Sequence, residues 1–162
     1  MPLLENHIAV VTGSGSGIGH AIASGYAREG ALVVLLDINE KAAAEAAREI
    51  REAGGRAESF ALDVTRREAC AAVARRIAGE VGPVSILVNN AGIARRNGML
   101  GAAEAVTSDW EDIIAINLTG VFLSMKYELQ QMRKHGSGTI VNMSSIAGLV
   151  GGAVGSPPPN ME

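Results

Sequence analysis

Short apolar runs alternate with segments of helical periodicity along most of the chain. The runs are Ile8–Val11, Leu32–Leu36, Ser59–Leu62, Val84–Val88 and Thr139–Met143. The second and the fourth are almost continuously apolar, which is typical of strands buried on both faces of a sheet. The pattern predicts five strands, with a helical segment between each strand and the next.

The segments between the runs carry apolar residues three or four positions apart, as amphipathic helices do. The stripe before the fourth run consists of Cys70, Val73, Ala74, Ile77 and Val81. The stripe before the fifth run consists of Ile113, Ile114, Leu118, Val121, Phe122, Met125, Leu129 and Met132. The segments Thr65–Glu68 and Ser108–Glu111 fit capping boxes at helix starts, while Gly30 and Gly54 are expected to cap helix ends.

Strand–helix–strand units with short links predict right-handed crossovers and a parallel sheet. We expect an α/β fold: a doubly wound parallel sheet of the Rossmann type with strand order 3-2-1-4-5 and helices on both faces. The 162 residues suffice for one domain, which we place at 1–155. Residues 156–162 contain three consecutive prolines, which exclude a helix, and we expect them to form an atypical proline-rich tail.

Charge and composition narrow the classes of function. The net charge is −3, and no basic segment could neutralise the phosphates of a nucleic acid or an anionic membrane. No apolar run approaches the ~20 residues of a membrane span, and no signal peptide is visible. The only cysteine, Cys70, lies in an apolar stripe, and the histidines lack metal-ligand spacing. We therefore expect a cytoplasmic protein with no metal, membrane or nucleic-acid partner.

A glycine-rich loop follows the first run and leads straight into a helix. Its glycines, Gly13, Gly17 and Gly19, have the spacing G-x-x-x-G-x-G. Gly13 would allow a tight turn, Gly17 a close approach of a pyrophosphate, and Gly19 close packing of helix on strand. The helix N-terminus would add partial positive charge. The loop predicts a dinucleotide site, and a plain tight turn is the alternative interpretation.

Asp37 directly follows the second run and closes the second expected strand, at the position where a carboxylate accepts hydrogen bonds from an adenosine ribose. Asp37 or Asn39 could equally cap the next helix, and the two roles are compatible. The glycine loop contains no lysine or arginine, and the residue after Asp37 is not one either. A 2′-phosphate would meet an uncompensated carboxylate, so we expect NAD to be preferred over NADP.

Further motifs follow the later runs in a set order. They are Asp63-Val64, the Asn-Asn-Ala-Gly sequence of Asn89–Gly92, Asn117 within Asn-Leu-Thr-Gly, and Ile140–Ser145, which ends in two serines. Together with the loop Thr12–Gly19, they make the chain resemble the short-chain dehydrogenase/reductase family from about residue 6 to about residue 152.

The resemblance implies roles for individual residues. The dinucleotide phosphates would contact Gly13, Ser14, Ser16, Gly17, Ile18 and Gly19. The adenine would be bordered by Asp63 and Val64, and the nicotinamide ribose side would be lined by Asn90, Ala91 and Gly92. Asn117 would hold a water of a proton relay, and Ser145 would hydrogen-bond the substrate oxygen. Without the family pattern, Asn117 would be an ordinary polar helix residue and Ser145 a turn former.

The chain departs from the family pattern at the tyrosine that exchanges the proton with the substrate oxygen and at the lysine that lowers the pKa of this tyrosine. Their expected positions hold Pro158 and Glu162, and neither Tyr26 nor Tyr127 is followed by lysine at the fourth position. We expect a form truncated before strands six and seven by a reading-frame or splicing change, and inactive in hydride transfer. Because the family's long helix commonly packs between subunits, we expect a homo-oligomer or self-association.

Three hypotheses of function remain. The first is an NAD-dependent oxidoreductase that moves hydride between a nicotinamide and a small alcohol or ketone. The second is a non-catalytic dinucleotide-binding module or sensor. The third is a related epimerase or dehydratase. The Thr-Gly and Asn-Asn-Ala-Gly motifs favour it less than a dehydrogenase, because they resemble those of the dehydrogenase branch. Arg95 and Arg96 lie in a loop that would border the substrate pocket, although solvated loop charges are the simpler interpretation.

Overall fold

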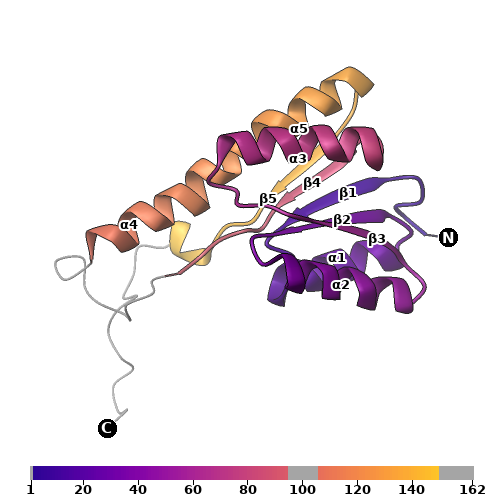
Figure 1. Cartoon of the computed structure of the whole chain (residues 1–162), viewed down its shortest axis with the longest axis horizontal. Helices are drawn as coiled ribbons and strands as arrows, with labels where there is room; N and C mark the ends of the chain where they lie inside the picture. Colours follow the sequence, from indigo (N-terminus) through magenta and orange to yellow (C-terminus); the bar gives the residue numbers. More distant parts are fainter. Residues whose placement is uncertain (1, 95–105, 150–162) are drawn as a thin grey trace, which may run out of the picture.

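A five-stranded parallel sheet forms the centre of the structure (Figure 1). The computed structural model describes residues 2–94 and 106–149. The strands are β1 (Ile8–Thr12), β2 (Leu32–Asp37), β3 (Arg56–Ala61), β4 (Ile86–Asn89) and β5 (Thr139–Asn142). Their order is β3-β2-β1-β4-β5, and every neighbouring pair is parallel, which confirms the predicted fold class and strand order.

Helices cover both faces of the sheet, α1 and α2 on one and α3 and α5 on the other (Figure 1). The helices are α1 (Gly17–Arg28), α2 (Glu40–Glu52), α3 (Arg67–Glu80), α4 (Thr107–Ile114), the π-helical segment η1 (Ala115–Gly120), α5 (Val121–His135) and the 3-10 turn η2 (Ile146–Gly148). The alternation of side chains along each strand explains the two layers. In β1, Ala9 and Val11 pack toward α1 and α2, whereas Val10 packs toward α3 and α5.

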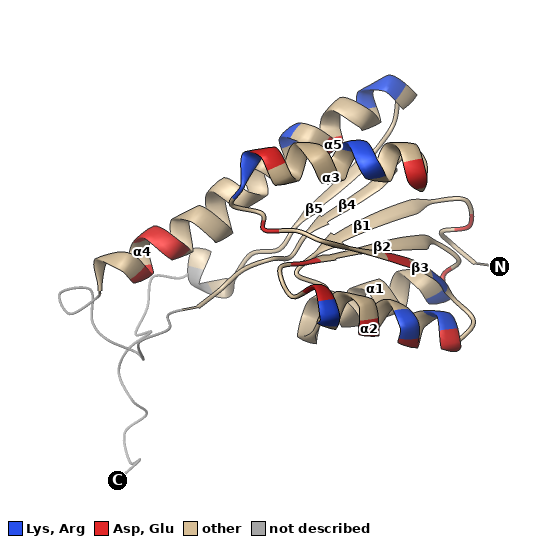
Figure 2. Cartoon of the chain, viewed as in Figure 1, with Lys and Arg blue, Asp and Glu red and all other residues tan. Residues whose placement is uncertain are grey.

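The third strand begins earlier than its apolar run suggested. Arg56 and Glu58 belong to β3, which is an edge strand of the described sheet and pairs with β2. Polar side chains on such a strand can point to solvent while Ala57 between them is buried. Charged residues otherwise lie mostly along the helices, and β1, β4 and β5 contain none (Figure 2).

The predicted helix starts differ from the observed ones. The N-cap of α3 is Arg66, because the Thr65 hydroxyl donates its hydrogen bond to Asp63 Oδ1 at 2.6 Å instead of capping the helix. Helix α4 has Val106 as its N-cap, so Ser108 lies inside the first turn. Both capping boxes were therefore wrong. The expected C-terminal glycines are confirmed: Gly30 has φ +91° and Gly54 has φ +87°.

The apolar stripe expected on the last long helix faces the sheet only in part. Met132 is buried as expected, but Leu118, Phe122 and Leu129 are exposed. The inward face of α5 instead contains two polar residues, Ser124 and Glu128. Packing against α3 and β4 sets the orientation of α5, so hydrophobicity alone identified only part of its inward face.

No helix in the described ranges is long and apolar enough to cross a membrane. Within the same residues, no group of three or more His, Cys, Asp or Glu side chains could hold a metal ion. The proline-rich tail, the boundary at residue 155 and the pair Arg95 and Arg96 lie outside the described residues.

Candidate dinucleotide site

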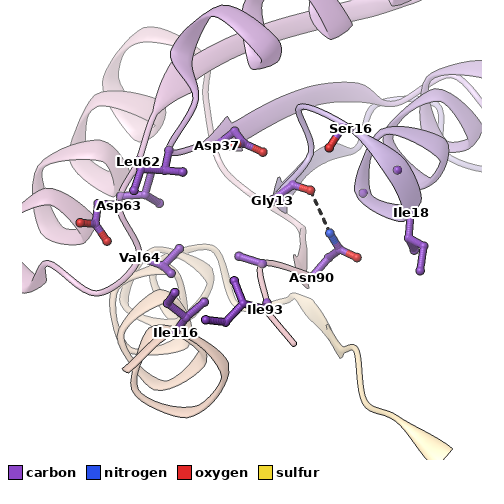
Figure 3. Close-up of a pocket in the computed structure, with 15 residues that line it drawn as sticks. Gly13, Ser16, Ile18, Asp37, Leu62, Asp63, Val64, Asn90, Ile93 and Ile116 are labelled. Carbon is purple, nitrogen blue, oxygen red and sulfur yellow. Dashed lines mark hydrogen bonds between the residues drawn. The ribbon is translucent and has the colours of Figure 1, made fainter. Parts of the chain in front are cut away.

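A cavity of about 450 Å³ opens at the carboxyl edge of the sheet (Figure 3). It is lined by Gly13, Ser16, Gly17, Ile18, Gly19, Asp37, Ile38, Leu62, Asp63, Val64, Asn90, Ala91, Gly92, Ile93 and Ile116. The loops after β1, β2, β3 and β4 meet here, because the strands are parallel and end at the same edge. The chain passes from β1 to β2 on one side and reaches β4 on the other, so this is the switch point where open α/β sheets bind ligands.

Two glycines of the loop after β1 are required by close contacts. A Cβ atom at Gly13 would lie 2.7 Å from Ala91 Cα, and one at Gly19 would lie 2.2 Å from the Gly13 carbonyl oxygen. Either would push the loop, α1 and the segment after β4 apart. Gly19 thus permits the close helix–strand packing predicted for it.

Gly17 is required for a different reason. Its φ is +56°, a left-handed conformation that side chains disfavour, and a Cβ atom there would meet nothing within 4 Å. Gly17 is also the first residue of α1 and lines the cavity. The backbone of a helix N-terminus is therefore open to a ligand, and its amides and partial positive charge suit a phosphate.

The serines of the loop point to different places. Ser14 is fully buried: its hydroxyl donates to the Val11 carbonyl at 2.8 Å and accepts from the Leu36 amide at 3.0 Å. It ties the loop to β1 and β2 and does not line the cavity. Ser16 is exposed, precedes α1 and lines the cavity. All the other predicted cofactor-binding residues line the cavity as well.

The Asp37 carboxylate joins two segments at the edge of the cavity. Its Oδ2 accepts from the Gly15 amide and its Oδ1 from the Asn39 amide, both at 2.9 Å. Asn39 is the cap of α2, because its side-chain oxygen accepts from the Ala42 amide at 3.1 Å. Each carboxylate oxygen can accept a second hydrogen bond, so Asp37 remains able to bind a ribose hydroxyl.

The wall opposite the glycine loop consists of Asp63, Val64 and Ile116 (Figure 3). Asp63 Oδ1 accepts from both the amide and the hydroxyl of Thr65, at 2.9 and 2.6 Å. Gly120 allows η1 to approach this wall closely, since a Cβ atom there would lie 2.7 Å from Val64 Cγ2. The apolar part of the wall has the character of a surface for an aromatic ring.

Thr12 holds the floor of the cavity together, a role that the sequence analysis did not assign. Its Oγ1 accepts from the amides of Asn90 and Ala91, both at 3.0 Å. In turn, the Asn90 side chain donates to the Thr12 carbonyl oxygen at 3.1 Å. It also donates to the Gly13 carbonyl oxygen at 3.0 Å (Figure 3). The sequence signal that could have revealed this role is a hydroxyl residue at the end of an otherwise apolar strand.

The two predicted catalytic residues lie differently with respect to the cavity. Asn117, in η1, pairs its side-chain amide with the backbone of Ile93, donating to the carbonyl and accepting from the amide at 2.9 Å each. It therefore holds a lining residue in place. Ser145 lies beyond β5, outside the lining, and its carbonyl accepts from Gly148 in η2. Their proposed catalytic roles stay predictions.

Four apolar lining residues were not predicted: Ile38, Leu62, Ile93 and Ile116. Ile38 and the predicted Ile18 are both largely exposed, and such side chains beside a glycine loop are the sequence signal that could have found this surface. The described lining contains two carboxylates, Asp37 and Asp63, and neither lysine nor arginine. The helix N-terminus is thus the source of positive potential in this lining.

A sequence model of the short chain dehydrogenases matches residues 7–157. The chain belongs to the short-chain dehydrogenase/reductase family. It is 46% identical over 146 residues to a cis-4-hydroxycyclohexanecarboxylate dehydrogenase of Sinomonas cyclohexanicum, covering 90% of this chain and 57% of that protein. It is 41% identical over 148 residues to the 2-(S)-hydroxypropyl-CoM dehydrogenase 3 of Xanthobacter autotrophicus, covering 91% of this chain and 57% of that relative.

A solved structure of a gluconate 5-dehydrogenase from Burkholderia cenocepacia, in complex with NADP and tartrate, has the same fold. The TM-score is 0.85 at 36% identity, and the match covers 91% of this chain and 56% of that one. The chain thus spans little more than half the length of the relatives it matches. The short-chain dehydrogenases/reductases are a family of oxidoreductases whose cofactors are nicotinamide dinucleotides.

Proposed function

We propose that the cavity binds a nicotinamide adenine dinucleotide, with its pyrophosphate at the N-terminus of α1. The observation that carries this proposal is Gly17, whose left-handed backbone is open to the cavity at the start of the helix. The residues also suit the rest of the cofactor. Asp37 can accept from the adenosine ribose, Asp63 and Val64 can border the adenine, and Asn90 can lie beside the nicotinamide ribose.

The corresponding reaction is hydride transfer between the cofactor and a small alcohol or ketone. The nicotinamide ring, when bound, supplies the site that accepts or donates hydride. The chain's own contribution is to hold the dinucleotide, to keep Asn90 and Ala91 fixed through Thr12, and to keep Ile93 fixed through Asn117. Both relatives are dehydrogenases named for hydroxylated substrates, which supports this class of substrate.

We further propose that NAD is preferred over NADP. Asp37 lies where a 2′-phosphate would come, and the described lining supplies no lysine or arginine to neutralise it. The gluconate 5-dehydrogenase that holds NADP is only 36% identical, so its cofactor does not decide the preference here. Parallel titrations of the chain with NADH and NADPH would measure the preference.

For the 162-residue chain itself we propose binding without useful hydride transfer. The sequence contains no tyrosine followed by lysine at the fourth position, and Ser145 lies outside the cavity lining. Loss of a positioned general acid–base typically costs ~10²–10⁴-fold in rate.

One pair of measurements tests these proposals. Titration calorimetry with NAD⁺ and NADH should show saturable binding, and incubation of the chain with NAD⁺ and a panel of secondary alcohols should produce no NADH above the protein-free rate. Binding without turnover agrees with the proposal for this chain. Protein-dependent NADH formation would refute its inactivity, and the lack of any saturable binding would refute the dinucleotide site itself.

A further inference from the structure

The inner face of α5 contains two polar side chains with unmet hydrogen-bonding capacity. Ser124 and Glu128 are one helical turn apart and only 6% and 4% exposed. Neither Ser124 Oγ nor Glu128 Oε2 has a hydrogen-bond partner among the described residues. Buried polar atoms in folded proteins nearly always have a partner, which is either protein or an ordered water.

A small cavity lies against both side chains, between the sheet, α3 and α5. Its volume is about 10 Å³, which approaches the ~10–15 Å³ that one water molecule requires. Its lining is apolar except for a few groups: Thr12, Cys70, Ser124, Tyr127 and Glu128. The space is too small for an organic ligand, and its polar atoms can satisfy the two to four hydrogen bonds of a buried water.

We propose that one water molecule occupies this cavity and bridges the Ser124 hydroxyl and the Glu128 carboxyl, and that this pair makes the packing of α5 on the sheet sensitive to pH. A water can both donate to and accept from a carboxyl group and a hydroxyl, so it would satisfy both orphaned atoms at once. The bridge would replace the direct hydrogen bond that the structure does not provide.

Within residues 2–94 and 106–149, the elements packed around Glu128 offer its charge no compensation. Neither η1 nor β4 contains an ionisable side chain, and the charged residues of α3 are all exposed. The ionisable groups that line the cavity with Glu128 are Cys70, whose pKa burial raises to about 11, and Tyr127. Burial raises the pKa of Glu128 to about 7, so the neutral carboxyl is the form that the fold favours.

The hydrated pair lies directly behind the candidate dinucleotide site. Thr12 lines the small cavity, while its hydroxyl oxygen accepts from the amides of Asn90 and Ala91 in the large one. Leu62 lines both cavities. Ionisation of Glu128 would therefore disturb the element that supports the floor of the large cavity, although the inference about pH does not depend on what that cavity binds.

The sign of the pH effect follows from the raised pKa. A carboxyl that binds its proton more tightly in the folded state stabilises the fold fully below its unfolded pKa of 4.5. That stability is lost as the pH rises through about 7. The expected loss between these limits is on the order of 100-fold in the folding equilibrium constant.

Urea unfolding at a series of pH values between 5 and 8 tests the proposal on the whole chain. Glu128→Gln keeps the shape and the hydrogen-bonding capacity of the side chain but cannot ionise. Glu111→Gln, which alters an exposed carboxylate on α4, is the matched control. The unmodified chain and the control should lose stability as the pH rises from 5 to 8, whereas Glu128→Gln should lose much less. All three proteins contain the same histidines, so the contribution of histidine titration cancels in the comparison.

Equal pH dependence in Glu128→Gln and the unmodified chain would overturn the proposal. If the variant does not fold, the carboxyl carbon of Glu128 can be followed by NMR in the unmodified chain. A titration midpoint near 7 supports the proposal and one near 4.5 contradicts it. The water itself is tested by a high-resolution crystal structure, which should show density between Ser124 Oγ and Glu128 Oε2 that Ser124→Ala weakens; a direct contact without water would disprove the bridge.

Discussion

Replacing Asp37 with alanine should change the choice between the two cofactors more than it changes the fold. The carboxylate has one oxygen on the Gly15 amide and one on the Asn39 amide, both at 2.9 Å, and it lines the cavity. A hydrogen bond to a charged group contributes about 1–3 kcal/mol, so NADH should bind about 5- to 150-fold more weakly. NADPH should lose less affinity or gain some, because the carboxylate that opposes its 2′-phosphate has gone.

The assay is a pair of fluorescence titrations, with NADH and with NADPH, on the unmodified chain and on Asp37→Ala. The variant also frees the Gly15 amide, so a general loosening of the loop needs its own control. Ser14→Ala supplies it: Ser14 ties the same loop to Val11 and Leu36 but does not line the cavity. That variant should weaken both cofactors alike. Tighter binding of NADPH than NADH by the unmodified chain, or an unchanged ratio in Asp37→Ala, would refute the reasoning.

Two further predictions concern stability and association. Thr12→Val keeps the volume of the side chain but removes the acceptor of the Asn90 and Ala91 amides. Urea unfolding should therefore show a free energy of unfolding about 1–3 kcal/mol lower than that of the unmodified chain. A difference within experimental error would mean that Thr12 does not hold the floor of the cavity together. Phe122 is 56% exposed on α5, close in sequence to the exposed Leu118. Sedimentation velocity should show self-association of the chain that Phe122→Ser reduces, and a monodisperse monomer at high concentration would contradict it.

The fold could be predicted because its sequence signals are local. Continuous apolar runs such as Leu32–Leu36 indicate strands covered on both faces, and glycines at Gly30 and Gly54 indicate helix ends. The order of the strands then follows from the handedness of the crossovers and from the glycine loop, which marks the first strand. The cavity could be located for the same reason. The loop needs glycine where its backbone is left-handed or closely packed, and these glycines can be seen in the sequence.

Features that depend on contacts between distant segments could not be predicted. The role of Thr12 needs β4 to end beside β1, which brings together residues 78 and 79 positions apart. Ser14 was expected to contact phosphates, yet its side chain is buried against β2, because the loop turns it inward. The inward position of Glu128 was missed because a periodicity of apolar residues gives no weight to a carboxyl group that burial can keep neutral.

The dinucleotide site is tested most directly by NADH binding to a matched pair of glycine variants, Gly17→Ala and Gly54→Ala. Both positions have a left-handed φ and open space around a new Cβ atom, so both variants should lose about 1–2 kcal/mol of stability from backbone strain. Only Gly17 lines the cavity. The account predicts that Gly54→Ala binds NADH as the unmodified chain does and that Gly17→Ala binds it at least tenfold more weakly. Equal affinity in the two variants would show that the start of α1 does not hold the dinucleotide.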